Sequence, residues 1–406
     1  GASAAVAPPV EKADATAWIA VAAGALGAML ATLDISIVNS ALPTIQGEIG
    51  ATGTEGTWIA TAFLVAEIII IPLSAWLERL LGLRTLLIVA VSAFTAFSVL
   101  CGIATDLTTM IIGRTGQGFM GGALIPTAMT IVAKRLPPSQ QPIGMALFGM
   151  TVVLGPVMGP LVGGWLTENL SWHYAFFVNV PVCALLLALL FIGLPHEKPD
   201  WVYLREADWA GIVGMILGLG GLTVVLEEGH REEWFESTLI VQLTLMTIVG
   251  FALLTYGQLY ARKPVLKLRL MLSRQFASVV VMALALGMVM YGSTYVIPQF
   301  LAIISDYNAL QTGFVIFWMG VPAFLLMPVL PFMIRRIHIR IAVGVGMFIM
   351  ALSCFVSINL TAASGGGVFT ESQFLRGIGM ILTMMFLNQA TVASVAKEDA
   401  GDASGI

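Results

Sequence analysis

Charged side chains are scarce in this sequence. Asp, Glu, Lys and Arg make up 10% of its 406 residues, hydrophobic residues make up 58%, and the mean hydropathy is +0.94. Soluble domains carry about 25% charged residues, so most of this surface is suited to lipid rather than to water. The net charge of −4 and the lack of a basic stripe also argue against nucleic acid as a partner.

The side chains of common active sites are equally sparse. Three cysteines stand in separate apolar runs without CxxC or Cys/His spacing, and four histidines fall at or near the ends of such runs. The sequence has no GxxxxGK[ST] loop for ATP, and no nucleophile with its base and no metal cluster at membrane depth. We therefore expect no enzyme activity, no metal and no cofactor.

Twelve long, nearly uncharged runs account for most of the chain. A helix needs about 20 apolar residues to cross the hydrocarbon core, and these runs are of that length. An open sheet has no partner for its edge groups in lipid, and barrel strands are shorter. The sequence therefore predicts an all-α polytopic membrane protein. The predicted spans are 17–42, 57–77, 83–104, 108–133, 142–165, 173–194, 209–226, 237–260, 276–301, 310–334, 340–360 and 372–396.

The distribution of basic residues predicts the orientation. When the spans alternate, every Lys and Arg except Arg114, Arg231 and Arg376 falls on one side of the membrane. Basic loop residues favour the cytoplasmic side, so both ends of the chain are expected in the cytoplasm.

The spans fall into three blocks behind a short tail. The tail, residues 1–16, lacks the basic segment and cleavage site of a secretory signal and is expected to be disordered. Six spans occupy 17–194, a charged linker with two further spans occupies 195–275, and four spans occupy 276–406. Two similar passages begin the fourth spans of the first and last blocks: IIGRTGQGFMGGALIP and SQFLRGIGMILTMM. Their similarity indicates two related halves of the chain, with a substrate site between them.

The fifth span contains the most specific motif, LGPVMGPLVGGWL. Its glycines recur four residues apart, with a proline after each of the first two, so one helix face is nearly bare backbone. Such a face lets membrane helices approach closely, and the prolines bend the helix. The motif residues are Gly155, Pro156, Gly159, Pro160, Gly163 and Gly164.

Four ionisable residues fall inside predicted spans, where each is by default a functional hypothesis. Asp34 and Arg114 both lie roughly 12 to 14 Å from the outer ends of their spans at 1.5 Å per residue, so they would pair if the helices are neighbours. Glu67 stands at the middle of an apolar span, which favours its neutral form and suits it to bind protons or a cation. Arg376 has no acidic partner in the matching span, and one interpretation is an anchor at the interface.

Several passages together resemble the major facilitator superfamily, in particular its fourteen-helix drug:proton antiporter branch of EmrB-type pumps. They are LDISIVNSALPTIQ, GTWIATAFLVAEIIIIPLSAWL, GRTGQGFMGGALIP, the Gly-Pro motif and WHYAFFVNVPV. The resemblance covers nearly the whole chain and implies two six-helix bundles plus two inserted helices, with the bundles rocking around a central cavity. It also implies that the Gly-Pro motif marks export and that Asp34 and Arg114 couple proton binding to conformational change.

The same resemblance suggests residues for a substrate cavity. Glu67 is expected there as well as in proton coupling, and polar residues of the fourth and ninth predicted spans are candidates with it. Those candidates are Gln117, Tyr291, Tyr295 and Gln299.

The sequence departs from the family pattern in two places. In AWLERLLGLRTLL, the family's Asp three residues before the glycine is replaced by Arg79, which puts a gating role of that loop in doubt. The chain also stops at KEDAGDASGI, where the family pattern continues through two more helices, so an incomplete last bundle is expected.

The predicted function is a proton-coupled antiporter that exports small amphipathic compounds by alternating access. An exporter of one metabolite is the nearest alternative, and a non-transporting receptor or scaffold is another. The expected location is the bacterial inner membrane, with lipid, protons and small-molecule substrates as partners. In a cell with two membranes, the resemblance adds a periplasmic adaptor and an outer-membrane channel.

Overall fold

The computed structural model describes residues 11–406, and helices are the regular secondary structure of this part of the chain. The predicted all-α fold is confirmed. Residues 1–10 of the expected tail lie outside the described residues, and the first helix begins at Ala15.

The first block contains eight helical segments. They are α1 (Ala15–Glu48), α2 (Gly53–Leu81), α3 (Leu83–Gly102), α4 (Leu107–Gly122), α5 (Leu124–Arg135), α6 (Gln141–Asn169), α7 (Tyr174–Phe177) and α8 (Asn179–Gly193). The linker forms α9 (Val202–Arg205), α10 (Trp209–Glu228), η1 (Trp234–Glu236), α11 (Thr238–Tyr260) and η2 (Leu268–Leu272).

The last block is more broken. Its helices are α12 (Arg274–Ile303), α13 (Ala309–Phe317), α14 (Val321–Leu326), α15 (Leu330–Arg336), α16 (Ile339–Val356), η3 (Gly366–Phe369), α17 (Thr370–Ala393), η4 (Lys397–Asp399) and α18 (Ala400–Gly405).

These helices account for each of the twelve predicted runs. Within residues 11–406, nine helices are long and apolar enough to cross a membrane, and a pair bent by 66° at 310–336 makes a tenth. The fourth predicted span is interrupted at Ala123 into α4 and α5, so neither part is long enough alone. The last span, α17, has 24 residues but includes Arg376, Asn388 and Gln389, which lower its hydropathy.

Local sequence explains several helix boundaries. Asp14 and Thr52 accept hydrogen bonds from the first-turn amides of α1 and α2, as N-cap residues do. Asn308 and Gln311 form a reciprocal capping box at the start of α13. Gly82 joins α2 directly to α3 with φ +81°, a backbone conformation that favours glycine.

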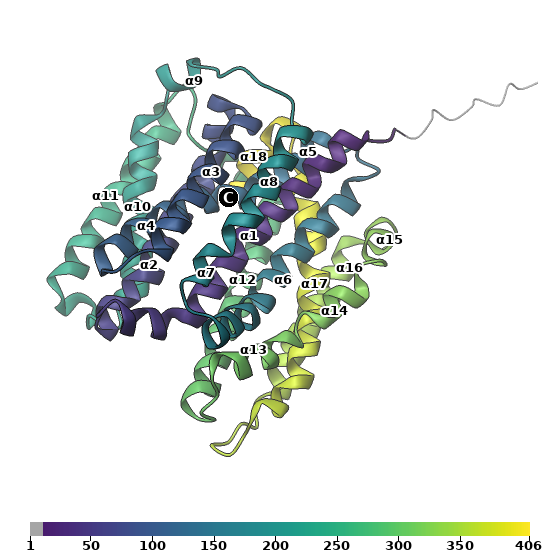
Figure 1. Ribbon diagram of the computed structural model, residues 1–406. Coiled ribbons are helices and arrows are strands. Elements are labelled where there is room, and N and C mark those ends of the chain that lie inside the picture. Colours follow the sequence, from purple (N-terminus) through teal and green to yellow (C-terminus); the bar gives the residue numbers. More distant parts are fainter. Residues whose placement is uncertain (1–10) are drawn as a thin grey trace, which may run out of the picture.

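The helices pack into two main hydrophobic clusters. One contains side chains of α1, α3, α5 and α8, and the other lies around α17 with α12, α14 and α16. Figure 1 shows α1 beside α8 and α17 beside α16. Helix α6 contributes to both, because Met145 and Phe148 belong to the first and Val153 and Val157 to the second. The inserted pair α10–α11 packs beside α2 through a separate cluster. The division at 17–194, 195–275 and 276–406 stays a prediction from the sequence.

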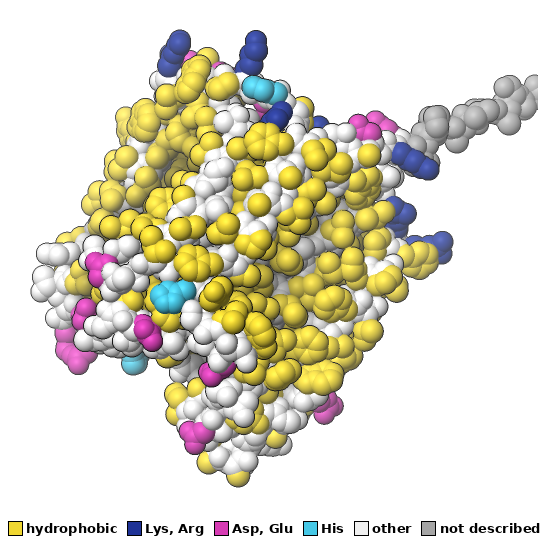
Figure 2. All heavy atoms as spheres, in the orientation of Figure 1, with side chains coloured by type: hydrophobic (Ala, Val, Ile, Leu, Met, Phe, Trp, Pro, Cys, Tyr) yellow, Lys and Arg dark blue, Asp and Glu magenta, His cyan; other side chains and the backbone are white. Residues whose placement is uncertain are grey.

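The surface has a hydrophobic band between two charged ends. Figure 2 shows apolar side chains covering the middle of the molecule, with Lys and Arg toward the upper and right edges and most Asp and Glu toward the lower edge. We call the end that holds Arg79, Lys134 and Lys267 the basic end. The end that holds Glu55 and Glu232 is the acidic end.

Candidate functional site

A buried polar network lies in the middle of the first block. The Arg114 Nη1 atom donates to Oδ2 of Asp34 at 2.9 Å, and both side chains are 1% exposed or less. Nδ2 of Asn179 donates to the other carboxylate oxygen, Oδ1, at 2.8 Å. Asp34 on α1 therefore accepts one hydrogen bond from a neutral donor on α8 and one from a charged donor on α4.

The remaining contacts of Arg114 are also internal. Nε donates to the carbonyl oxygen of Ile59 on α2 at 3.1 Å, and Nη1 also reaches Oε1 of Gln117 at 3.0 Å. The guanidinium lies 4.2 Å from the ring centre of Phe63, a cation–π contact. A buried ion pair is tolerated only when its other hydrogen-bonding groups are satisfied, and this network largely meets that condition.

Two members of the network were missed by the sequence analysis. Ser98 on α3 accepts from Nε2 of Gln117 at 2.8 Å and from Asn179 at 3.3 Å, and Ser98 and Asn179 are almost fully buried. The signal for Asn179 was present as a polar residue inside WHYAFFVNVPV. Gln117, which the sequence assigned to a substrate cavity, instead lies wholly buried inside this network.

Glycines of α4 allow the network to be so compact. A Cβ atom added to Gly118 would overlap the Phe63 backbone carbonyl, and one added to Gly116 would overlap the Phe97 ring. The motif GRTGQGFMGG therefore places α2 and α3 close enough to α4 for Arg114 to reach across to α1 and α2.

The Gly-Pro motif of α6 faces α1 at close range. Cβ atoms added to its three spaced glycines would overlap three small polar residues of α1 that have the same four-residue spacing. The pairs are Gly155 with Thr32, Gly159 with Ser36, and Gly163 with Ser40. The expected close approach is thus present, and its partner is the helix that holds Asp34.

Helix α6 also contacts the second half of the molecule. Gly149 faces Met385 of α17, and Gly313 of α13 lies against the backbone at Leu161. The other residues of the motif, Pro156, Pro160 and Gly164, lie in this same helix.

Glu67 makes no hydrogen bond to the network among the described residues, although Arg114 and Asp34 lie within electrostatic reach of it. Its side chain is buried at 8% exposure, and its Oε2 atom has no hydrogen-bond partner among the described residues. Tyr291 of α12 is within electrostatic reach of Glu67, although these residues belong to different blocks. One exposed side of α12 carries three residues with a four-residue spacing: Tyr291, Tyr295 and Gln299. The two tyrosines are 69% and 67% exposed. We call these three residues the tyrosine stripe, and their place in a substrate cavity stays a prediction.

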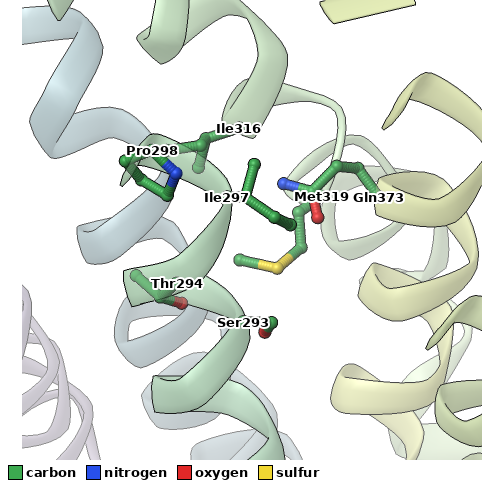
Figure 3. Close-up of a pocket in the computed structure, with 7 residues that line it drawn as sticks. All are labelled: Ser293, Thr294, Ile297, Pro298, Ile316, Met319 and Gln373. Carbon is green, nitrogen blue, oxygen red and sulfur yellow. The ribbon is translucent and has the colours of Figure 1, made fainter. Parts of the chain in front are cut away.

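Arg376 does not anchor at the interface, which corrects that interpretation. Its side chain is 3% exposed, and Nη1 donates to Oε1 of Gln373 at 2.5 Å. Gln373 also lines a cavity of about 10 Å³ beside α12 and α13, shown in Figure 3 with Ser293 and Thr294. This cavity admits a single water rather than a substrate.

One ion pair joins the first and last blocks at the basic end. Arg79, the residue that departs from the family pattern, pairs with buried Asp402 of α18. Its neighbour Glu78 pairs with Lys134 of α5, and α18 packs against both α2 and α5. In place of the expected Asp, an arginine thus contacts the segment that follows α17.

Within residues 11–406, no three His, Cys, Asp or Glu residues are grouped to hold a metal ion. The polar groups described here can instead exchange protons and bind charged or hydrogen-bonding molecules.

Comparison with known proteins indicates one family. The model of the Major Facilitator Superfamily matches residues 24–406. The chain is 32% identical to the colistin resistance protein EmrB of Acinetobacter baumannii over 391 residues, which is 96% of this chain and 76% of that protein. It is 30% identical to the multidrug export protein EmrB of Escherichia coli K12 over 384 residues, which is 94% of this chain and 74% of that protein.

A solved structure shows the same fold. The human organic anion transporter MFSD10 superposes with a TM-score of 0.65 at 17% identity, covering 98% of this chain and 89% of that one.

Proposed function

Because this chain belongs to the major facilitator superfamily and is of the EmrB type, we propose that it is a proton-coupled antiporter that exports small amphipathic compounds by alternating access. The observation that supports this most directly is the buried Asp34–Arg114 pair. The name of the Escherichia coli relative, a multidrug export protein, supports efflux of several compounds rather than one.

Protonation of Asp34 is the proposed coupling step. A proton on this carboxylate removes the charge that balances Arg114. Leaving a buried charge without its partner costs about 3–5 kcal/mol. Reversing a two-state equilibrium from 1:99 to 99:1 takes about 5.5 kcal/mol, so one protonation supplies a large part of that change.

Helix α1 links this step to the interface between the halves. Asp34 faces α4 and α8, whereas Thr32 and Ser36 face the glycines of α6. Helix α6 in turn contacts α13 and α17 of the second half. A shift of α1 on proton binding would therefore be transmitted through rigid, closely packed backbone rather than through flexible side chains.

Glu67 has a different proposed role. It is buried without a countercharge in direct contact, and Tyr291 of the tyrosine stripe lies within its electrostatic reach. An ionised carboxylate in such a place would be stabilised by a cationic substrate. We therefore assign Glu67, Tyr291, Tyr295 and Gln299 to substrate binding, and Glu67 also to proton exchange.

The proposed setting is the bacterial inner membrane with the N-terminus and the basic end in the cytoplasm. By likeness to EmrB-type pumps, a periplasmic adaptor and an outer-membrane channel are proposed partners in cells with two membranes.

Transport in proteoliposomes tests the proposal. With an imposed pH gradient and a panel of amphipathic compounds, the protein should move several of them and move protons in the opposite direction. Transport of one compound only would support the single-metabolite alternative. No transport of any compound and no proton movement would contradict the proposal.

A further inference from the structure

A second cavity lies at the basic end, outside the proposed transport path. Its volume is about 300 Å³, and it is formed by the end of α2, the short helix α9, the segment between α11 and α12, and the turn before α18. Neither the Asp34 network nor Glu67 lines it.

The lining carries more positive than negative charge. Four basic residues line the cavity: Arg79, Arg262, Lys263 and Lys267. The first is paired with Asp402 and the last with Asp399.

Arg262 and Lys263 are the cations available to a ligand. Arg262 has no ion pair among the described residues, and Lys263 has one half-exposed pair, at 3.3 Å from Glu206. The Lys263 Nζ atom also lies 4.4 Å from the ring centre of Tyr203, which holds it at the cavity wall. An Arg beside a Lys is suited to bind the oxygens of a phosphate.

The surroundings place the cavity at the depth of lipid headgroups. Trp76 lines it and packs edge-on against Trp209 at 6.3 Å between ring centres. Trp209 is 54% exposed and Tyr260, at the end of α11, is 72% exposed. Exposed Trp and Tyr at the ends of membrane helices mark the interface with the headgroups. The apolar outer sides of α10 and α11 continue from there into the hydrophobic band.

We propose that this cavity binds the phosphate headgroup of an anionic phospholipid of the phosphatidylglycerol class. Arg262 and Lys263 hold the phosphate, and the acyl chains lie along α10 and α11. The exposed carboxylate of Glu398, which also lines the cavity, accepts hydrogen bonds from the glycerol hydroxyls of the headgroup. Basic pockets at the ends of membrane helices are suited to such headgroups. The inference does not depend on the proposed transport mechanism.

Lipid titration of the whole chain in a neutral detergent tests the inference. The probes are phosphatidylglycerol, phosphatidylcholine and inorganic phosphate, and native mass spectrometry gives the bound fraction of each lipid. The pocket variant is Arg262→Ala with Lys263→Ala. The matched control is Lys198→Ala with Arg340→Ala, which removes the same charge from exposed residues outside the cavity.

The pocket variant should bind phosphatidylglycerol about 25-fold more weakly, since each of the two basic side chains near a headgroup contributes about fivefold. The control variant and phosphatidylcholine binding should be unchanged. A third variant, Arg262→Lys with Lys263→Arg, keeps both charges and should bind as the unchanged chain does, which separates charge from misfolding.

Equal phosphatidylglycerol affinity in the pocket and control variants would overturn the proposed site. Displacement of the lipid by inorganic phosphate at similar concentration would show a site for free phosphate and would overturn the lipid assignment.

Discussion

Ser36 of α1 lies directly against Gly159 of α6, so that a Cβ atom at position 159 would overlap the serine side chain. The same relationship recurs one turn before and one turn after it along both helices. Small residues on both sides let the two backbones meet, and this contact lies on the helix that holds Asp34.

Gly159→Leu should insert in the membrane but fail to transport, because overpacking of a close contact costs about 1–3 kcal/mol and separates α6 from α1. Gly344→Leu is a matched control, since an added Cβ there meets nothing within 4 Å. The milder Gly159→Ala should regain activity when combined with Ser36→Gly, which removes the overlapping side chain. Transport is measured in proteoliposomes after checking expression. Full activity of Gly159→Leu would show that this contact is not required.

The partner of the Gly-Pro motif could not be read from the sequence. A small-residue face predicts a close neighbour but does not say which helix it is, because that depends on the packing of all the spans. The Asp34–Arg114 pair was easier to predict, because equal depth in two spans limits which charged residues inside the membrane can meet. Asn179 and Ser98 were missed because single polar residues in apolar runs have no distinctive spacing. The contacts of Gln117 with Arg114 and Ser98 were missed for a related reason: its spacing from Arg114 did not reveal which neighbours its amide would meet.

Arg79 and Asp402 should show energetic coupling, because they join the two halves at the basic end. Arg79→Ala and Asp402→Ala should each lower thermal stability and transport, and the double variant should be little worse than either one. Exchanging the charges, with Arg79→Asp and Asp402→Arg, should restore part of the loss. Thermal unfolding of the unchanged protein, the two single alanine variants and the double alanine variant measures this coupling as a double-mutant cycle. Additive losses would mean that the two side chains act independently.

The orientation predicts which residues an impermeant thiol reagent reaches in intact cells. In a Cys354→Ser background, Glu236→Cys at the acidic end should be labelled, and Lys198→Cys should be labelled only after permeabilisation. The other two native cysteines are buried and do not interfere. The reversed pattern would overturn the orientation, and with it the outward placement of the acidic end.

Asp34→Asn should abolish proton-coupled transport of every substrate. Asparagine preserves the size of the side chain, and its single amide oxygen can still accept from Arg114 or from Asn179, but it cannot change charge. The protein should therefore still fold and bind substrate, while an imposed pH gradient drives no uptake. Proton release on substrate addition, followed with a pH dye, is the direct measurement. Continued proton exchange by this variant would move the coupling site elsewhere.

Glu67→Gln should impair cationic substrates most and leave neutral ones nearly unchanged. Glu67 is buried, its Oε2 atom lacks a hydrogen-bond donor among the described residues, and Tyr291 of α12 lies within its electrostatic reach. Glutamine removes the countercharge for a cation but leaves the Asp34–Arg114 pair, and with it the coupling step, intact. Transport of one cationic and one neutral compound, driven by the same pH gradient, compares the two effects in one preparation. Glu67→Asp, which keeps the charge on a shorter side chain, should retain part of the cation transport. If Glu67→Gln abolishes transport of both compounds equally, Glu67 belongs to the coupling machinery rather than to substrate binding, because the loss then no longer depends on the charge of the substrate.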